Sequence, residues 1–223
     1  MLKILITRFK QGRRTLSFPN GKAPVLPARY RGRPIVAGRG DGLDLGKSTF
    51  IPDDNFRYSS DYRMAVSRRE DLVIGGNEYT LAHTLNNKIM KLFGRSLKLR
   101  QVSAGGCNAC EADINVLNTP VFDLSRFGIQ FVASPRHADG IVVTGPITRN
   151  MRQALIKTYE AIPDPKIVIA IGSCAISGGI FAGEKESSGG LHSIIPVDLY
   201  IPGCPPHPLT TLDGLLRLTG RLK

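Results

Sequence analysis

The chain has 223 residues, of which 42% are hydrophobic, enough for the buried core of one domain or of a domain with an extension. No apolar run approaches the roughly 18 to 20 residues that cross a bilayer. We therefore expect any association with a membrane to be peripheral or to go through partner proteins. The formal net charge is +12.

The basic excess lies in the first part of the chain. Residues 1–100 contain 20 Lys and Arg against 8 Asp and Glu, whereas residues 101–223 contain 10 of each kind. Such a segment can meet anionic lipid headgroups, an acidic partner protein or nucleic acid. No nucleic-acid-binding motif accompanies the charge, so we expect a protein or lipid partner and no nucleic acid.

The pair Arg13 and Arg14 has the form of a twin-arginine export signal. The residues that follow, 15–27, are polar and rich in proline where such a signal needs an apolar stretch. We therefore expect a cytoplasmic, reducing location. In that location cysteines are metal ligands or redox thiols more often than structural disulfides.

The first part of the chain predicts one helix, then an extended arm. Residues 1–12 predict a short basic amphipathic helix. The simplest interpretation is that this helix packs on the body of its own protein. Residues 13–60 are rich in Gly, Pro and Arg, which indicates an arm that covers another surface and needs a partner to be ordered. Apolar residues at helical spacing predict a second helix over residues 81–93, with Gly94 as its stop.

From Ser96 onward the pattern alternates between strand and helix. This order predicts an α/β fold, a flavodoxin-like doubly wound parallel sheet, whose functional loops lie at the carboxyl ends of the strands. The strands are expected over residues 97–103, 129–133, 140–144, 166–171 and 198–201, and the helices over residues 110–117, 147–161 and 207–221.

The four cysteines, Cys107, Cys110, Cys174 and Cys204, each follow a predicted strand. Because the carboxyl ends of parallel strands meet at one sheet edge, we expect the four thiolates to converge there. Gly106 and neighbouring glycines let the backbone approach a bulky inorganic group. Four thiolates are the ligand set of a [4Fe–4S] cluster, and a Cys-Pro pair like Cys204-Pro205 also ends ferredoxin-type cysteine runs.

Other interpretations of the cysteines remain open at this point. Structural zinc usually takes its ligands from two close cysteine pairs, and the chain has one such pair. A thioredoxin-like dithiol would use Cys107 and Cys110 and leave Cys174 and Cys204 unexplained. The cysteines could also be inert buried thiols. In that case it would be a coincidence that every one of them follows a predicted strand.

Four blocks of sequence carry a resemblance to a known family: GGCNACEADI, FGIQFVASPRHADGIVVTGPITRNM, IGSCAISGG and VDLYIPGCPPHP. They resemble the family of the 20 kDa subunit of respiratory complex I and the small subunits of membrane-bound, energy-converting [NiFe] hydrogenases of the formate hydrogenlyase type. The resemblance covers about residues 96–220. Asn108 and Ala109 separate the first two cysteines as in hydrogenases, whereas complex I has adjacent cysteines, so the hydrogenase branch is favoured.

The resemblance implies that the four cysteines bind the cluster nearest to the active site of a separate large subunit. The [NiFe] centre needs four cysteines of its own and is therefore expected on that subunit, with this chain relaying electrons. Exported small subunits continue into a domain with two more clusters. Because this chain ends 19 residues after Cys204, we expect one cluster.

Charged residues near the cysteines have a functional and a plain interpretation. Arg136 matches an arginine beside the cluster in the complex I relatives, where a cation would raise the potential, and its plain role is a turn arginine. Glu111 could bond the amides of a cluster loop or lie on a proton route, and so could Asp113. For both we favour the first-turn helix role, in which a carboxylate complements the helix dipole. We expect His137 and His207 to be loop or interface residues.

The amino-terminal blocks LKILITRFKQGRRT, ARYRGRPIV and DYRMAVSRREDLVIGG resemble parts of the ferredoxin-like, two-cluster subunit of the same complexes. Residues 1–106 contain no cysteine. The resemblance implies a basic extension over residues 1–80, a remnant without its own cluster, and an iron–sulfur domain over residues 81–223. The implied partners are a large subunit, a ferredoxin-like subunit and membrane subunits. The alternatives are a complex I-like subunit that serves quinone or another acceptor, and a structural zinc module.

Overall fold

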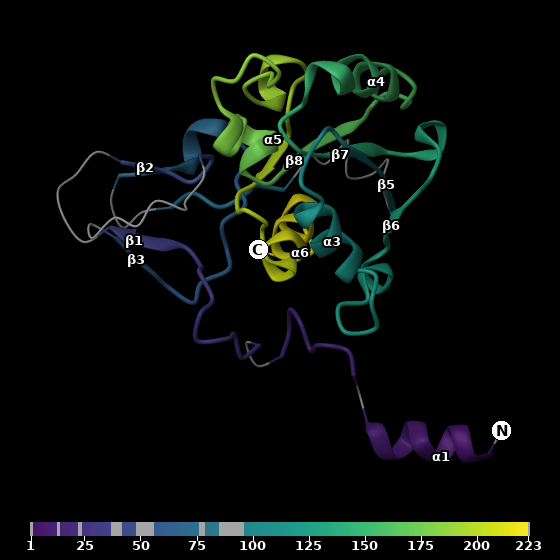
Figure 1. The fold of residues 1–223 in the computed structure, drawn as a ribbon. Coiled ribbons are helices and arrows are strands. Elements are labelled where there is room, and N and C mark those ends of the chain that lie inside the picture. Colours follow the sequence, from purple (N-terminus) through teal and green to yellow (C-terminus); the bar gives the residue numbers. More distant parts are fainter. Residues whose placement is uncertain are drawn as a thin grey trace.

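The computed structural model describes residues 2–12, 14–21, 24–36, 42–47, 56–75, 79–84 and 96–222 (Figure 1). The helix predicted over residues 81–93 falls largely on residues 85–95, which lie outside the described part. Residues 81–84 carry no regular secondary structure. No helix in the described ranges is long and apolar enough to cross a membrane.

A five-stranded sheet forms the centre of the molecule. Its strand order is β6-β5-β7-β8-β9, and every neighbouring pair is parallel. This is the flavodoxin-like order, so the predicted fold class is confirmed. The strands are β5 (Leu97–Ser103), β6 (Ile129–Phe131), β7 (Gly140–Thr144), β8 (Ile167–Ile171) and β9 (Leu199–Ile201).

Helices cover both faces of the sheet, and alternate residues of a strand pack against each layer. On β7, Val142 packs into the cluster that contains α3 and α6, whereas Ile141 and Val143 pack into the cluster that contains α4 and α5. Both central strands, β7 and β8, are therefore buried along their whole length. The helices are α3 (Ala109–Val116), α4 (Arg149–Glu160), α5 (Ser173–Ser177) and α6 (Pro208–Leu218).

Short 3₁₀ helices connect these elements. They lie in the connections between strands and helices. One of them, η3, contains Arg136, the arginine expected from the sequence to lie near the cluster. Their bounds are η1 (Arg69–Leu72), η2 (Leu124–Phe127), η3 (Pro135–His137), η4 (Gly179–Phe181) and η5 (Leu191–Ser193).

The amino-terminal segments pack on the chain's own α/β body. They contribute two small antiparallel sheets, β1 (Pro34–Val36) with β3 (Phe56–Tyr58) and β2 (Leu43–Asp44) with β4 (Val73–Ile74). Val66 exchanges two backbone hydrogen bonds with Tyr200 and so extends the main sheet beyond β9. The predicted arm also bonds the body of the same chain, since the Ser177 hydroxyl donates to the carbonyl oxygen of Gly46 over 2.6 Å.

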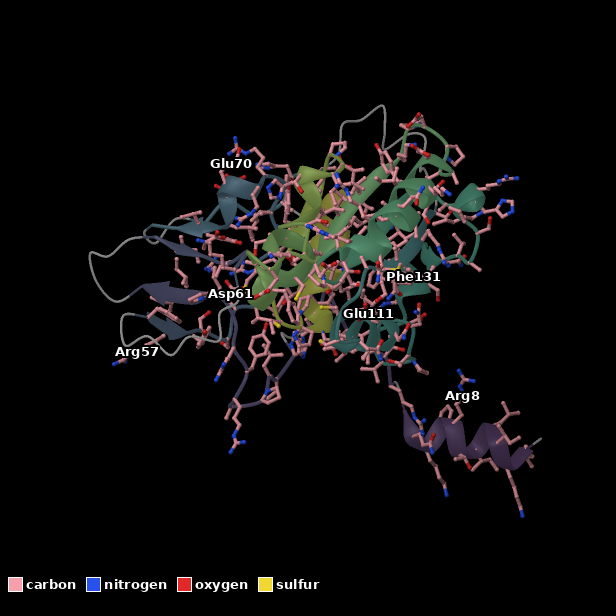
Figure 2. The ribbon with its side chains drawn as sticks, turned by 45° about the horizontal axis from the view of Figure 1, so that its top comes forward. Arg8, Arg57, Asp61, Glu70, Glu111 and Phe131 are labelled. Atoms are coloured by element: carbon pink, nitrogen blue, oxygen red, sulfur yellow. The ribbon has the colours of Figure 1, made fainter. Side chains whose placement is uncertain are left out.

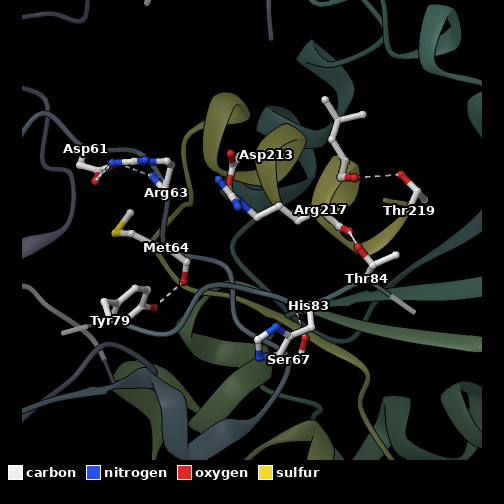
Figure 3. Close-up of polar contacts among 11 residues, drawn as sticks. Asp61, Arg63, Met64, Ser67, Tyr79, His83, Thr84, Asp213, Arg217 and Thr219 are labelled. Atoms are coloured by element: carbon white, nitrogen blue, oxygen red, sulfur yellow. Dashed lines mark hydrogen bonds and ion pairs between the residues drawn. The ribbon is translucent and has the colours of Figure 1, made fainter. Parts of the chain in front are cut away.

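Hydrogen bonds hold this segment against α6 and close it on itself (Figure 3). The Thr84 hydroxyl donates to the carbonyl oxygen of Arg217 over 3.2 Å, and the Tyr79 hydroxyl donates to that of Met64 over 2.6 Å. On α6, Arg217 forms a buried ion pair with Asp213, with 2.9 Å between Nε and Oδ2. These bonds pair polar groups that would otherwise be costly to bury.

The helix α1 (Leu2–Gln11) confirms the amphipathic helix predicted at the start of the chain. It has no buried residue, and Figure 1 shows it standing apart from the α/β body. The plain interpretation, in which this helix packs on its own protein, is therefore wrong for this structure. The guanidinium of Arg126 bonds the carbonyl oxygens of Leu16 and Phe18 and so attaches the chain to the body just after α1.

Candidate cluster site

The four cysteines lie on three loops at the carboxyl edge of the sheet, as predicted. Cys107 lies between β5 and α3, and Cys110 is in the first turn of α3. Cys174 is in α5, directly after β8, and Cys204 follows β9. All four are free thiols.

Glycines allow the loops to approach closely. Gly172 has φ +88°, and a Cβ atom at that position would lie 2.6 Å from Sγ of Cys110, on a different loop. Gly179 likewise leaves room for Sγ of Cys174, which would lie 3.0 Å from an added Cβ. Between the first two cysteines, Asn108 adopts the left-handed conformation, which turns the chain into α3.

Backbone hydrogen bonds join the second loop to the third. The amide of Gly172 donates to the carbonyl oxygen of Ile201 over 2.9 Å, and that of Ser173 donates to Gly203 over 2.8 Å. The Ser173 hydroxyl also bonds the Gly203 carbonyl, at 3.2 Å. Cys174 and Cys204 are therefore held in a fixed relation by the loops that carry them.

The thiols are partly buried and influence one another electrostatically. Burial raises the pKa of Cys110, and so do the charges of Glu111 and of the other three cysteines. Burial and neighbouring thiolates raise the pKa of Cys174 to about 11, and they also raise the pKa of Cys204. These thiolates would need a cationic group beside them to persist at neutral pH.

The donor set fits an iron–sulfur cluster in its chemistry. It consists of four cysteine sulfurs, close enough to affect one another's ionisation, among loops that leave space at glycines. No group of three or more His, Cys, Asp or Glu side chains within the described ranges is arranged to hold a single metal ion. A bound cluster would supply the positive charge that four thiolates require.

Glu111 is buried in the body next to this loop, where Figure 2 labels it. Its Oε1 accepts a hydrogen bond of 2.5 Å from the Thr144 hydroxyl at the end of β7. Burial would raise the pKa of this carboxyl, but hydrogen bonds from Ser103 and Thr144 outweigh it and lower the pKa. Glu111 therefore joins the ends of β5 and β7 to α3. An added Cβ at Gly106 would lie 3.6 Å from its Oε1.

The predicted arginine and histidines occupy different environments. Arg136 and His137 are exposed on η3, which lies between β6 and β7 and belongs to none of the segments that carry the cysteines. His207 is half-buried and caps α6, because its Nδ1 accepts a hydrogen bond from the amide of Leu209 over 3.2 Å. Its ring and that of Tyr30 form a T-shaped pair, with 5.2 Å between ring centroids.

Sequence reasoning missed the contribution of the amino-terminal segment to this edge of the molecule. Tyr30 and its neighbours form one wall of a cavity of about 300 Å³, and the loop that carries Cys204 forms another. Tyr30 precedes His207 by 177 residues, and no local pattern pairs them. The lining residues are Arg29, Tyr30, Arg31, Gly32, Pro34, Leu45, Tyr58, Met64, Pro202, Gly203, Cys204, Pro205, Pro206 and His207.

Fold and site together define a class of protein: a flavodoxin-like α/β domain with four free cysteines at the carboxyl edge of its sheet. The family model described as "NADH ubiquinone oxidoreductase, 20 Kd subunit" matches residues 107–218, which include all four cysteines. The chain belongs to this family, whose members are subunits of oxidoreductase complexes.

Curated relatives lie on both branches of the family. Formate hydrogenlyase subunit 7 of Escherichia coli is 45% identical over 140 residues, which are 63% of this chain and 55% of the relative. The probable membrane-bound hydrogenase subunit mbhJ of Pyrococcus furiosus is 44% identical, over 58% of this chain and 77% of the relative. An NADH-quinone oxidoreductase subunit of Heliobacterium modesticaldum is 41% identical, over 54% and 69%. The chain thus spans about half the length of the first of these relatives.

A solved structure supports the same family. A chain of the membrane-bound sulfane sulfur reductase, an archaeal respiratory membrane complex, superposes with a TM-score of 0.53 at 36% identity. The superposition covers 61% of this chain and 75% of the other. The shared part therefore corresponds in size to the α/β body.

Proposed function

We propose that the chain is the electron-relay subunit of a membrane-associated, hydrogenase-like complex, and that Cys107, Cys110, Cys174 and Cys204 bind one [4Fe–4S] cluster. The observation that carries this proposal is the position of the four cysteines directly after β5, β8 and β9, at one edge of the sheet. When bound, such a cluster takes up and releases single electrons. The chain's own residues position the ligands and limit the access of water.

Residues around the ligands support the cluster in different ways. Glu111 anchors the first turn of α3 through Thr144, and Gly106 packs closely on Gly145, whose Cα would lie 3.1 Å from an added Cβ. We assign to Arg136 the role of a nearby cation once a partner covers η3. A cation there would favour the more negative, reduced cluster and raise its potential.

The complex that we propose has several further parts. A separate large subunit carries the [NiFe] centre, a ferredoxin-like subunit exchanges electrons, and membrane subunits hold the assembly on the cytoplasmic face of the membrane. The names of the two hydrogenase relatives support this assembly. Within the chain, residues 81–223 form the cluster-binding unit, and residues 1–80 form the basic extension.

A second candidate is a complex I-like subunit that serves quinone or another acceptor without hydrogen chemistry. The NADH-quinone oxidoreductase relative favours it. Purification of the native complex separates the two functions. Nickel, two C-x-x-C pairs in the large subunit and hydrogen-dependent dye reduction identify a hydrogenase, whereas absence of nickel and of dye reduction identifies the second candidate.

The ligand set is tested by replacing single cysteines, Cys174→Ser and Cys204→Ser. We expect about four irons and four sulfides per wild-type chain, and loss of the reduced-state EPR signal in each variant. Ser96→Ala, an exposed change just before β5, is the control and should keep the signal. An unchanged signal in a cysteine variant would remove that residue from the ligand set, and zinc in place of iron would identify a structural module instead.

A further inference from the structure

The helix α1 has an apolar surface that the rest of the described chain does not cover. All ten of its residues are exposed, including Leu5 at 62% and Phe9 at 92% of their full accessible surface. Side chains of this size are normally buried, and an exposed group of them marks an interaction surface.

The apolar residues of α1 lie on one side of the helix. At 100° per residue, Leu2, Leu5, Ile6 and Phe9 form a single stripe, which we call the apolar stripe. Lys3 and Lys10 lie along one border of the stripe, and Arg8 lies toward its other border. Ile4 is on the opposite side of the helix, although it is also exposed, at 71%.

The apolar stripe is turned away from the body. A hollow lies between α1 and Pro120, which belongs to the connection between α3 and η2. Ile4, Thr7 and Gln11 line that hollow, together with the two basic residues Lys3 and Arg8, and no residue of the stripe does. In Figure 1 the helix lies outside the α/β body, and in Figure 2 Arg8 is labelled beside it.

The charge around α1 has one sign. Residues 1–40 contain ten Lys and Arg and no Asp or Glu. A surface that receives this segment must therefore be anionic. The helix has ten residues, so it is about 15 Å long, which is half the thickness of a bilayer core.

We propose that α1 lies in the plane of an anionic membrane surface, with the apolar stripe among the acyl chains and Lys3, Arg8 and Lys10 at the lipid phosphates. Cations along both borders of a short apolar stripe are the arrangement of interfacial helices. An anionic lipid surface can contact both the apolar stripe and the basic residues along its borders. A protein groove would need acidic residues placed to match those basic residues. Arg126, which bonds Leu16 and Phe18, would then hold the α/β body close to that surface.

Vesicle binding by the purified full-length chain with its cluster tests the proposal. We expect cosedimentation with vesicles that contain phosphatidylglycerol and little with pure phosphatidylcholine. Replacing Lys3, Arg8 and Lys10 by Ala should weaken binding about 100-fold, because each cation near the surface contributes about 1 kcal/mol, or about a fivefold factor. Leu5→Ser and Phe9→Ser should each weaken it about tenfold or more.

Ile4→Ser is the matched control, because Ile4 is as exposed as Leu5 but lies on the opposite side of α1. Binding of this variant should be unchanged. Equal binding to both vesicle types, or equal losses in Ile4→Ser and Leu5→Ser, would overturn the proposal. Failure to bind any vesicle, with loss of an acidic partner subunit from the Phe9→Ser complex, would assign α1 to a protein groove. Iron and sulfide content, measured on the same samples, reports the cluster independently of lipid binding.

Discussion

At the scale of single residues, the protonation state of His207 affects the start of α6, which directly follows the loop that carries Cys204. Burial lowers the pKa of this histidine below its ordinary value, so the ring is neutral in the folded protein at neutral pH. The neutral ring accepts the hydrogen bond of the Leu209 amide at the start of α6. Protonation would remove this acceptor and place a positive charge at a helix amino terminus, where the helix dipole opposes it.

We predict that the free energy of unfolding falls as the pH drops below about 6.5. Below that pH the unfolded chain binds a proton at His207 while the folded chain does not, so protonation favours the unfolded state, by up to about 1.4 kcal/mol per pH unit. Denaturant unfolding between pH 8 and pH 5.5 measures the slope. His207→Asn, which keeps a capping acceptor and removes the titration, should flatten it. Equal slopes in the two proteins would refute this role.

At the scale of elements, α6 occupies the most enclosed position among the described helices. Each of its residues from Pro208 to Leu218 is buried between the sheet and the amino-terminal segment. Gly214 is the point of closest approach, because a Cβ atom there would lie 2.6 Å from Cβ of Ala65. A glycine inside a helix normally costs about 1 kcal/mol relative to alanine, so close packing explains its presence.

We predict that Gly214→Ala lowers the free energy of unfolding by about 1–2 kcal/mol. The added methyl group overpacks the contact with Ala65, and the gain in helix propensity offsets part of that cost. The double variant Ala65→Gly/Gly214→Ala should recover most of the loss, because one methyl group then occupies the space. Denaturant unfolding of the four proteins of this cycle gives the coupling energy, and additive losses would show that the two residues do not compete.

The main strands could be predicted closely from the sequence, because each is a short apolar run between turn residues. β5 and β7 have the predicted bounds, and β8 and β9 each begin one residue later. The predicted strand over residues 129–133 ends at Phe131. The sheets of the amino-terminal segment could not be predicted, because their strands have two or three residues and pair only through contacts distant in sequence, such as Ile35 with Arg57.

The candidate site shows the same limit. The sequence predicted that each cysteine follows a strand. This was sufficient to predict that their loops lie at one edge of the sheet, because the carboxyl ends of parallel strands share an edge. The partners of Glu111 could not be predicted, because Ser103 and Thr144 become its neighbours only when β5 and β7 pair. The structure places Glu111 in the first turn of α3, as the sequence predicted, and shows in addition a buried hydrogen bond to Thr144 that the sequence could not indicate.

At the scale of the whole molecule, the sheet and the cysteine loops depend on different interactions. The residues of β7 and β8 are buried, and each strand has neighbours on both sides. The loops contain left-handed residues such as Gly105 and Asn108, and Cys107 is exposed. Apolar packing therefore maintains the sheet, whereas the loops are held by fewer contacts, such as the backbone hydrogen bonds of Gly172 and Ser173, to which the proposed cluster would add.

We predict that removal of the cluster loosens the loops and leaves the sheet folded. Anaerobic hydrogen exchange of the intact and chelator-treated chain should show amides of residues 104–110, 172–179 and 202–207 exchanging about tenfold faster or more, because metal binding contributes directly to the local folding free energy. Amides of β7 and β8 should keep their protection, since apolar packing on both faces holds them. If these strands lost protection together with the loops, the cluster would be required for the entire fold, and the separation of sheet and site would be wrong.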